Sequence, residues 1–202
     1  MQGAGVKRIL DITLTLLAAP VWVPVMAVVA VLVLCKLGRP VFFRQMRAGL
    51  KGKPFEIVKF RTMLNGDGPD SERLTRFGRI LRATSLDELP ELLLVLKGTM
   101  SLVGPRPLPV EYLERYTPEE MHRHDVKPGI TGWAQVHGRN FLDWEMKFRY
   151  DLWYTINASV WLDLKILAMT VVQVFTARGV SAKGEATMGE FRKELKGGKD
   201  DS

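Results

Sequence analysis

Residues 12–35 read ITLTLLAAPVWVPVMAVVAVLVLC and contain no charged side chain, although 25% of the chain is charged. As a straight helix this stretch would reach about 36 Å at 1.5 Å per residue. The hydrocarbon core of a bilayer is about 30 Å thick. The apolar run continues well past its small residues at 18 and 19, so it does not resemble a cleavable signal peptide. We therefore expect the chain to reside at a membrane.

Two features of this stretch favour a re-entrant helix over a single span. Pro20 and Pro24 lie in the middle of the run, where each removes a backbone donor and disrupts the preceding turn. Basic residues also flank both ends, whereas a spanning helix should show a basic excess on one side only. A helix that enters one leaflet, bends at the prolines and returns to the same face explains both features. A true span and a soluble, buried helix remain as alternatives. The flanking basic residues are Lys7, Arg8, Lys36, Arg39, Arg44 and Arg47.

The net charge of the chain limits the kinds of molecule that we expect it to bind. The chain has 202 residues, with 29 Lys and Arg against 22 acids, which gives a net charge of +7. Such a balance suits nucleic acid, anionic lipid or a phosphorylated substrate. Because the apolar stretch points to a membrane, we expect lipid and a phosphorylated substrate as partners and no nucleic acid. The single cysteine, Cys35, rules out an intramolecular disulfide.

The rest of the chain predicts mostly helix with one small β-hairpin, an α+β fold. Two β-prone runs at 40–45 and 55–63 flank a turn-rich segment and indicate a hairpin. A surface loop is expected at 64–72, irregular structure at 101–109 and another loop at 127–140. Helices are expected at 73–83, around 109–124 and in two later stretches. The last of these, 159–175, is apolar over most of its circumference, so a core helix and an interfacial amphipathic helix are equally compatible with it.

An adjacent pair of acids, Asp87 and Glu88, has two interpretations. Ser85 to Glu88 fits the S-x-x-E capping box. If Asp87 is the N-cap instead, Pro90 falls harmlessly in the first turn. Either register places Asp87 at the positive end of a helix, where an ionised carboxylate is favoured. Such an aspartate can also attack phosphorus, and a neighbouring Glu88 suits Mg²⁺. Spacing alone leaves both roles open, with the cap the commoner one.

Two weaker candidates lie further along the chain. Arg106, in GPRP, is a guanidinium in a rigid loop, which suits either a phosphate site or an exposed turn. His122, His124 and Asp125 have the residue types of metal ligands. However, side chains at i and i+2 do not share a helix face, so a structural zinc site is a minor alternative.

Several segments in order resemble one family. They are KFRTM at 59–63, SLDELPELLLVLKGTMSLVGPRPL at 85–108, HRHDVKPGITGWAQVHGRN at 122–140 and YDLWYTINASVWLDLKIL at 150–167. Together they are similar to the bacterial sugar transferases, the monotopic phosphoglycosyl transferases, and in particular to the small PglC-like members. The resemblance covers nearly the whole chain.

The resemblance implies a location and a reaction. The re-entrant helix would keep both of its ends cytoplasmic, at the bacterial inner (cytoplasmic) membrane. The enzyme would move a phosphosugar from a UDP-sugar to polyprenyl (undecaprenyl) phosphate and release UMP, with Mg²⁺ as cofactor. A covalent aspartyl-phosphosugar would be the intermediate. This reaction is the first membrane step of glycoconjugate and polysaccharide assembly, so downstream glycosyltransferases are expected partners.

The resemblance also implies roles for particular residues. Asp87 would be the nucleophile and Glu88 a Mg²⁺ ligand. Substrate phosphate or nucleotide would be met by Lys59, Arg82, Arg106 and Lys127. Lys127 stands where an arginine is common in the family, so bidentate contact is lost there. Ala19 stands where a serine commonly precedes the proline, so the bend must rely on Pro20 and Pro24.

We accordingly divide the chain into three parts. Residues 1–39 form the re-entrant membrane helix with its basic flanks, 40–187 the catalytic domain on the cytoplasmic face, and 188–202 a polar C-terminal tail. The small, single-domain form suggests an N-acetylated aminosugar as donor, with hexose donors such as UDP-galactose as the alternative. The alternative from another class of protein is a non-enzymatic basic module on the membrane surface that recruits a partner.

Overall fold

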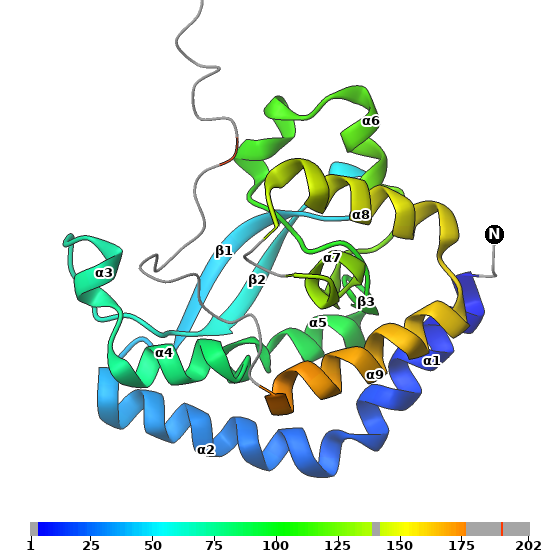
Figure 1. Cartoon of the computed structure of the whole chain (residues 1–202). Coiled ribbons are helices and arrows are strands. Elements are labelled where there is room, and N and C mark those ends of the chain that lie inside the picture. Colours follow the sequence, from blue (N-terminus) through cyan, green and yellow to red (C-terminus); the bar gives the residue numbers. More distant parts are fainter. Residues whose placement is uncertain (1–3, 139–141, 177–190, 192–202) are drawn as a thin grey trace, which may run out of the picture.

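The computed structural model describes residues 4–138, 142–176 and 191. Helices dominate, with one antiparallel hairpin and one short parallel pair of strands (Figure 1), which confirms the predicted α+β class. The α-helices are α1 Ala4–Leu17, α2 Ala19–Leu37, α3 Asp70–Arg73, α4 Arg76–Ala83, α5 Glu91–Lys97, α6 Pro118–Met121, α7 Trp133–Val136, α8 Trp144–Asn157 and α9 Val160–Thr176. The strands are β1 Phe42–Ala48, β2 Pro54–Phe60, β3 Ser101–Val103 and β4 Gly129–Thr131. Short 3₁₀ turns are η1 Leu50–Gly52, η2 Leu86–Glu88, η3 Val110–Arg115 and η4 His122–His124.

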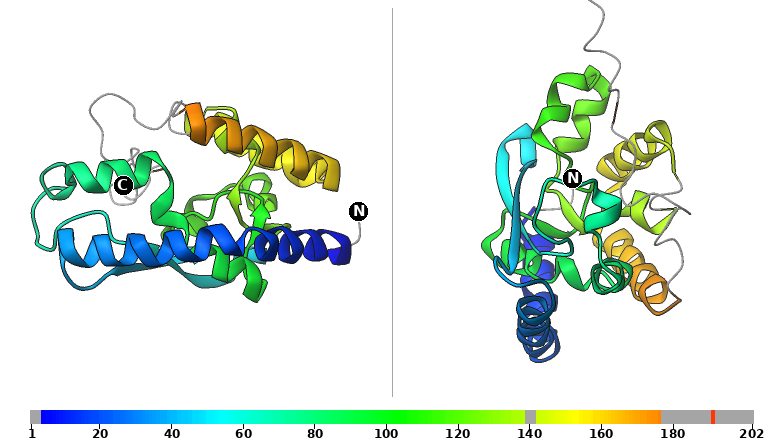
Figure 2. Two further views of the ribbon diagram at one scale, coloured as in Figure 1. Left: turned by 90° about the horizontal axis from the view of Figure 1, so that it is seen from below. Right: turned by 90° about the vertical axis from the view of Figure 1, so that its left-hand side faces the viewer.

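The apolar stretch forms two helices that meet at Ala18. Pro20 lies in the first turn of α2, whereas Pro24 is accommodated inside α2. The two helices meet at an angle in Figure 1 but lie along one line when seen from below (Figure 2, left), so the bend lies in one plane. At the bend, the indole Nε1 of Trp22 donates a hydrogen bond of 2.9 Å to the carbonyl of Thr15. A side chain from α2 therefore supplies a donor to the end of α1.

Helix α2 is largely uncovered by the rest of the protein. Among the described residues it is the one helix long and apolar enough to cross a membrane. Many of its side chains are exposed, including Val21 and Val31, while Val29 and Val33 are buried. The buried side packs with Phe60 of β2 and Leu81 of α4. One face of α2 is therefore joined to the remaining protein and the other is left apolar and open.

The hairpin forms where the sequence predicts it and extends further on its first strand. β1 and β2 pair antiparallel from Phe42 opposite Phe60 to Ala48 opposite Pro54. The rings of Phe42 and Phe60 stack with centroids 5.3 Å apart.

A second core lies between the short parallel sheet and the last two helices. It contains Val103, Val136, Tyr154, Leu162 and Ile166. On the outer face of α9 the apolar side chains stay exposed, with Trp161 the most open of the large ones at 80%. Helix α9 thus buries one face in the core, and its other face retains the apolar surface expected of an interfacial helix.

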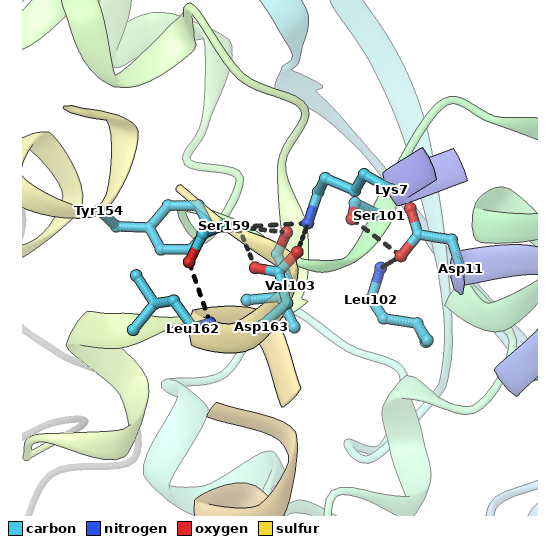
Figure 3. Close-up of polar contacts among 9 residues, drawn as sticks. All are labelled: Lys7, Asp11, Ser101, Leu102, Val103, Tyr154, Ser159, Leu162 and Asp163. Atoms are coloured by element: carbon cyan, nitrogen blue, oxygen red, sulfur yellow. Dashed lines mark hydrogen bonds and ion pairs between the residues drawn. The ribbon is translucent and has the colours of Figure 1, made fainter. Parts of the chain in front are cut away.

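Helix α1, which precedes the apolar stretch, is bound to the same body by polar contacts (Figure 3). Lys7 Nζ lies 2.5 Å from Asp163 Oδ2 of α9. Asp11 Oδ1 accepts hydrogen bonds of 3.0 Å from the Ser101 hydroxyl and the Leu102 N–H. Residues before the apolar stretch therefore contact the elements that follow it.

The far end of the apolar stretch is held to that body as well. Arg61, just after β2, donates hydrogen bonds of 2.5 Å and 2.7 Å to the carbonyls of Leu37 and Gly38 at the end of α2. The contacts of Lys7 and Asp11 on one side and of Arg61 on the other therefore bind both flanks of the apolar stretch to the same part of the protein.

Several local expectations need correction. The loop at 64–72 contains the start of α3, and the helix expected from 73 begins only at Arg76, because Thr75 accepts a capping bond from the Gly78 N–H. The loop at 127–140 contains β4 and α7. β4 pairs with β3, within the segment predicted to be irregular. The piece at 109–124 is broken into 3₁₀ turns around α6. Most of the predicted tail lies outside the described residues, but Phe191 is buried.

Candidate active site

Asp87 and Glu88 lie in a 3₁₀ turn ahead of α5, not in a capping box. Ser85 adopts a left-handed conformation with φ of 56°, and within the described residues its side chain makes no capping hydrogen bond. α5 begins only at Glu91, with Pro90 as its N-cap. The capping interpretation of Ser85 and of Asp87 is therefore wrong. A proline at position 90 disfavours an α-helix that starts as early as Ser85, and the chain tightens into η2 instead.

Asp87 is a buried carboxyl with a strongly perturbed environment. Burial, followed by the charge of Glu88, raises the pKa of Asp87 from 3.8 to about 6. The charges of Lys59, Arg106 and Arg82 oppose this shift. Asp87 is thus an aspartate surrounded by three cations and poised to change its protonation near neutral pH.

Glu88 is clamped by two of these cations. Its Oε1 accepts a hydrogen bond of 2.6 Å from Lys59 Nζ and another of 2.6 Å from Arg106 Nη2. Burial alone would raise the pKa of Glu88, but the charges and hydrogen bonds of Arg106 and Lys59 outweigh it and hold that pKa well below its usual range. Glu88 is therefore ionised throughout the physiological range.

Arg82 reaches the pair from α4. Its Nε donates a hydrogen bond of 3.0 Å to the hydroxyl of Thr62, just beyond β2. α4 approaches this segment closely at Gly78, where an added Cβ would lie 1.8 Å from the Thr62 carbonyl oxygen. A larger side chain at 78 would push α4, and Arg82 with it, away from the site.

The structure does not bring every predicted residue to this pair. The charged groups that affect Lys127 are Arg8, Asp11 and Lys7, on α1, and burial is the main cause of its lowered pKa. Lys127 therefore lies beside the N-terminal helix, whereas Lys59, Arg82 and Arg106 surround Asp87.

The two histidines of the HRHD segment diverge. His122 is exposed and pairs with Asp125 at 2.8 Å, while His124 is buried and its Nδ1 lies 3.0 Å from the Gly49 carbonyl oxygen. Across the described residues, no three His, Cys, Asp or Glu side chains are grouped so that they could hold a metal ion. The zinc alternative therefore finds no support in the part of the chain that is described.

The carboxylates nevertheless suit Mg²⁺ when a phosphorylated substrate is present. Mg²⁺ is usually bound through one or two carboxylates together with substrate phosphates, rather than by an all-protein cage. Glu88 stays ionised, and both of its hydrogen bonds described above are made by one oxygen, Oε1. The donor set therefore fits a cation that is shared with a substrate.

Comparison with known proteins agrees with this site. Residues 2–177 match the model of the family described as bacterial sugar transferase. The chain belongs to the bacterial sugar transferase family. It is 48% identical over 191 residues to the uncharacterized sugar transferase EpsL of Bacillus subtilis, an alignment that covers 92% of this chain and 95% of that relative. The resemblance inferred from the sequence is thereby confirmed.

Two further relatives carry more specific names. A UDP-glucose:undecaprenyl-phosphate glucose-1-phosphate transferase of Caulobacter vibrioides is 41% identical, with 84% of this chain and 70% of the relative covered. A UDP-N-acetylgalactosamine-undecaprenyl-phosphate N-acetylgalactosaminephosphotransferase of Aeromonas hydrophila is 40% identical, with 87% of this chain covered. The alignment spans 45% of that longer protein.

Two residues of this sugar transferase were missed by reasoning from sequence. Glu91, buried in the first turn of α5, places Oε1 3.2 Å from Lys59 Nζ. Its spacing of three from Glu88 was the available signal. Arg123 lies between the two histidines that drew attention, and its Nη2 donates a hydrogen bond of 2.8 Å to the Arg106 carbonyl. Sequence alone held no signal for that contact.

Proposed function

We propose that this sugar transferase is a phosphoglycosyl transferase that moves a phosphosugar from a UDP-sugar to polyprenyl phosphate and releases UMP. The observation that carries the proposal is the buried Asp87, next to the clamped Glu88 and facing Lys59, Arg82 and Arg106. One carboxylate is available for attack, and cations are gathered where two polyanionic substrates would meet. Relatives of Caulobacter, Klebsiella and Escherichia that are named as UDP-glucose:undecaprenyl-phosphate glucose-1-phosphate transferases support the same reaction.

The reaction proceeds in two displacements at one phosphorus atom. An Asp87 carboxylate oxygen attacks the phosphorus that bears the sugar, and the bond from this phosphorus to the bridging oxygen breaks, so that UMP leaves with that oxygen. A phosphate oxygen of the polyprenyl phosphate then attacks the same phosphorus. The bond to Asp87 breaks, which regenerates the carboxylate and yields polyprenyl-diphosphate-sugar for downstream glycosyltransferases.

The side chains around Asp87 balance the negative charge of the substrates and keep Asp87 ionised. Arg106 is half exposed, so its guanidinium can leave Glu88 for a donor phosphate. Arg82 and Lys59 lower the pKa of Asp87 and thereby favour its nucleophilic, ionised form. Glu88 would be the main protein ligand of Mg²⁺, which supplies charge neutralisation at the phosphates when bound.

The topology that suits this function is the re-entrant one. Lys7 and Asp11 before the apolar stretch, and Leu37 and Gly38 after it, are bonded to the same body. A true span would place residues 1–11 across the membrane from Asp163 and Ser101. This arrangement supports a monotopic enzyme with both flanks and the catalytic domain on the cytoplasmic face of the inner membrane.

The donor sugar is the least constrained part of the proposal. We favour an N-acetylated aminosugar, as in the name of the Aeromonas relative. Other relatives are named for glucose, and one of Salmonella typhimurium for galactose. A panel of UDP-sugars must therefore include all three types.

The test is UMP release by purified protein supplied with undecaprenyl phosphate, Mg²⁺ and each UDP-sugar in turn. We expect release with one donor class, and none from Asp87→Asn. With UDP-sugar alone, intact-mass measurement should show wild-type protein heavier by one phosphosugar. Asp67→Asn, at an exposed loop position, is the matched control and should behave as wild type.

Two outcomes would contradict the proposal. Turnover by Asp87→Asn at more than a few per cent of the wild-type rate would remove the nucleophile role. Folded wild-type protein that binds lipid vesicles but releases no UMP with any donor would favour the non-enzymatic recruiting module.

A further inference from the structure

The loop that carries Arg106 is fixed through its carbonyl groups. Its residues 105–109 read PRPLP, and the three prolines have no N–H to donate. Each carbonyl of the run nevertheless accepts a hydrogen bond. The donors are Gly129 N–H to Pro105 (3.0 Å), Arg123 Nη2 to Arg106 (2.8 Å), Arg47 Nη1 to Pro107 (3.4 Å), Ala48 N–H to Leu108 (2.9 Å) and Tyr112 N–H to Pro109 (3.1 Å).

The bond at Arg106 itself comes from a deeply buried side chain. Arg123, in η4, is 2% exposed. Its Nη2 lies 2.6 Å from Asp151 Oδ2 on α8, and its Nε lies 3.2 Å from the same oxygen. The guanidinium also lies over the rings of Phe148 and Tyr116, at 5.5 Å and 5.9 Å from their centroids. Arg123 is thus held by a carboxylate and two aromatic faces, so it is a rigid donor.

These contacts connect the buried Arg123–Asp151 ion pair to Glu88, the neighbour of Asp87. Asp151 holds Arg123, Arg123 holds the backbone of Arg106, and the Arg106 side chain donates to Glu88 at 2.6 Å. The guanidinium of Arg106 is half exposed while its backbone is anchored in the interior. A side chain whose backbone is already fixed loses less conformational freedom when it binds a ligand.

We infer that Arg123, held by Asp151, is a positioning residue that sets Arg106 for the diphosphate of the UDP-sugar. The inference rests on the proposed function, in which Arg106 meets a donor phosphate. Arg123 itself does not touch the substrate, because its side chain is almost fully buried. Its effect should therefore fall on binding of the nucleotide donor and spare the polyprenyl phosphate.

A purely structural ion pair is the competing explanation. Removing one partner of a buried pair leaves an uncompensated charge and destabilises the fold. Replacing both partners by apolar residues of similar volume avoids that penalty. Arg123→Lys keeps the charge, but a single ammonium group lacks the planar fork that reaches both Asp151 and the Arg106 carbonyl. The double variant Arg123→Met with Asp151→Leu removes the bond to Arg106 without leaving a charge unpaired.

The test measures UDP affinity by calorimetry in the Asp87→Asn background, where chemistry cannot interfere. We expect Arg123→Lys and the double variant each to weaken UDP binding about tenfold. In otherwise wild-type protein, KM for the UDP-sugar should rise by a similar factor, while KM for undecaprenyl phosphate stays within about twofold. Thermal unfolding of each variant shows how much of the protein is folded at the assay temperature.

The matched control is Asp163→Asn, which breaks the ion pair between the buried Asp163 of α9 and Lys7 of α1 and leaves the Arg123–Asp151 pair intact. It should lower the unfolding temperature and leave UDP affinity unchanged. Equal UDP affinity in folded Arg123 variants and their parent would overturn the positioning role. Loss of affinity in Asp163→Asn to the same degree would also overturn it, because general destabilisation would then explain both. Absence of UMP release from wild type would instead count against the proposed function.

Discussion

Lys59 Nζ lies 2.6 Å from Oε1 of Glu88, which ties the end of β2 to the turn that carries Asp87. The same ammonium group lies 3.2 Å from Glu91 on α5. One lysine therefore serves two buried carboxylates, and its charge also lowers the pKa of Asp87. The hairpin thus contributes directly to the chemistry of a turn some thirty residues further along the chain, as well as to the core.

Replacing Lys59 by methionine should impair transfer severely. The change keeps the length and apolar stem but removes the cation shared by Glu88 and Glu91, so the pKa of Asp87 should rise further. We expect the rate of UMP release at pH 7 to fall about a hundredfold, the magnitude typical of a lost electrostatic contact in an active site. Lys53→Met, at an exposed position before β2, is the control. A Lys59→Met enzyme with wild-type rates would show that the clamp has no role in transfer.

The rate of phosphosugar transfer to Asp87 should depend on its ionisation. The pKa of Asp87 is raised to about 6, so the carboxylate is lost as pH falls through that value. Below it the rate of the first half-reaction should drop about tenfold per pH unit. The check is intact-mass detection of the phosphosugar adduct in rapid-quench samples from pH 4.5 to 8 with UDP-sugar alone, whose diphosphate does not titrate in this range. A flat profile down to pH 4.5 would contradict a raised pKa.

The raised pKa of Asp87 also predicts that Asp87→Asn stabilises the protein at neutral pH. A proton binds Asp87 more tightly in the folded state than at the ordinary pKa of 3.8, so ionisation disfavours the fold. This cost appears as pH rises above 3.8 and is complete above about 6. It should amount to between about 1 and 3 kcal/mol.

Thermal unfolding of wild type and Asp87→Asn at pH 7.5 and pH 4 checks this expectation. The variant should unfold at the higher temperature at pH 7.5, and the difference should shrink as the pH approaches 4. Asp67→Asn should show no such trend. A lower unfolding temperature for Asp87→Asn at pH 7.5 would mean that the ionised carboxylate stabilises the fold.

Much of the fold was accessible from sequence where a local pattern determines an element. The β-prone runs on either side of the turn-rich RAGLKGK predict the β1–β2 hairpin, and Pro20 with Pro24 predicts the bend in the apolar stretch. The β3–β4 pair was missed because each strand has three residues and too little pattern. Its close approach depends on Gly129, where an added Cβ would lie 2.0 Å from the Gly104 nitrogen.

The residues of the candidate site likewise include some that the sequence could predict and some that it could not. Asp87 and Glu88 are adjacent in sequence, so their pairing was visible before any fold was known. Arg123 was not, because its role depends on Asp151, which α8 supplies from 28 residues further along. The capping prediction failed because the local S-x-x-E pattern was outweighed by Pro90. The role of Arg123 thus depends on a tertiary contact, and the conformation of the Asp87 turn depends on one proline that the local pattern did not take into account.

The N-terminus should be reachable from the cytoplasmic side only. Gly5 has open space around it, so Gly5→Cys is tolerated. Combined with Cys35→Ser, it gives a protein with one thiol near the start of α1. A membrane-impermeant maleimide should leave this thiol unlabelled in intact cells and label it in inverted membrane vesicles. Labelling in intact cells would establish a true span and separate residues 1–11 from the catalytic domain.

Trp22 should stabilise the bend through its indole N–H and not only through its size. The indole is buried and donates to the Thr15 carbonyl at 2.9 Å. Trp22→Phe keeps an aromatic ring but leaves that carbonyl without this donor, in a region where lipid offers none. The free energy of unfolding should fall by about 1–3 kcal/mol. It is measured as a lower unfolding temperature in lipid nanodiscs. Trp161→Phe, at an 80% exposed position on α9, is the matched control and should unfold close to wild type. If both variants shift equally, the hydrogen bond across the bend contributes nothing, and the angle between α1 and α2 must be set by Pro20 and packing alone.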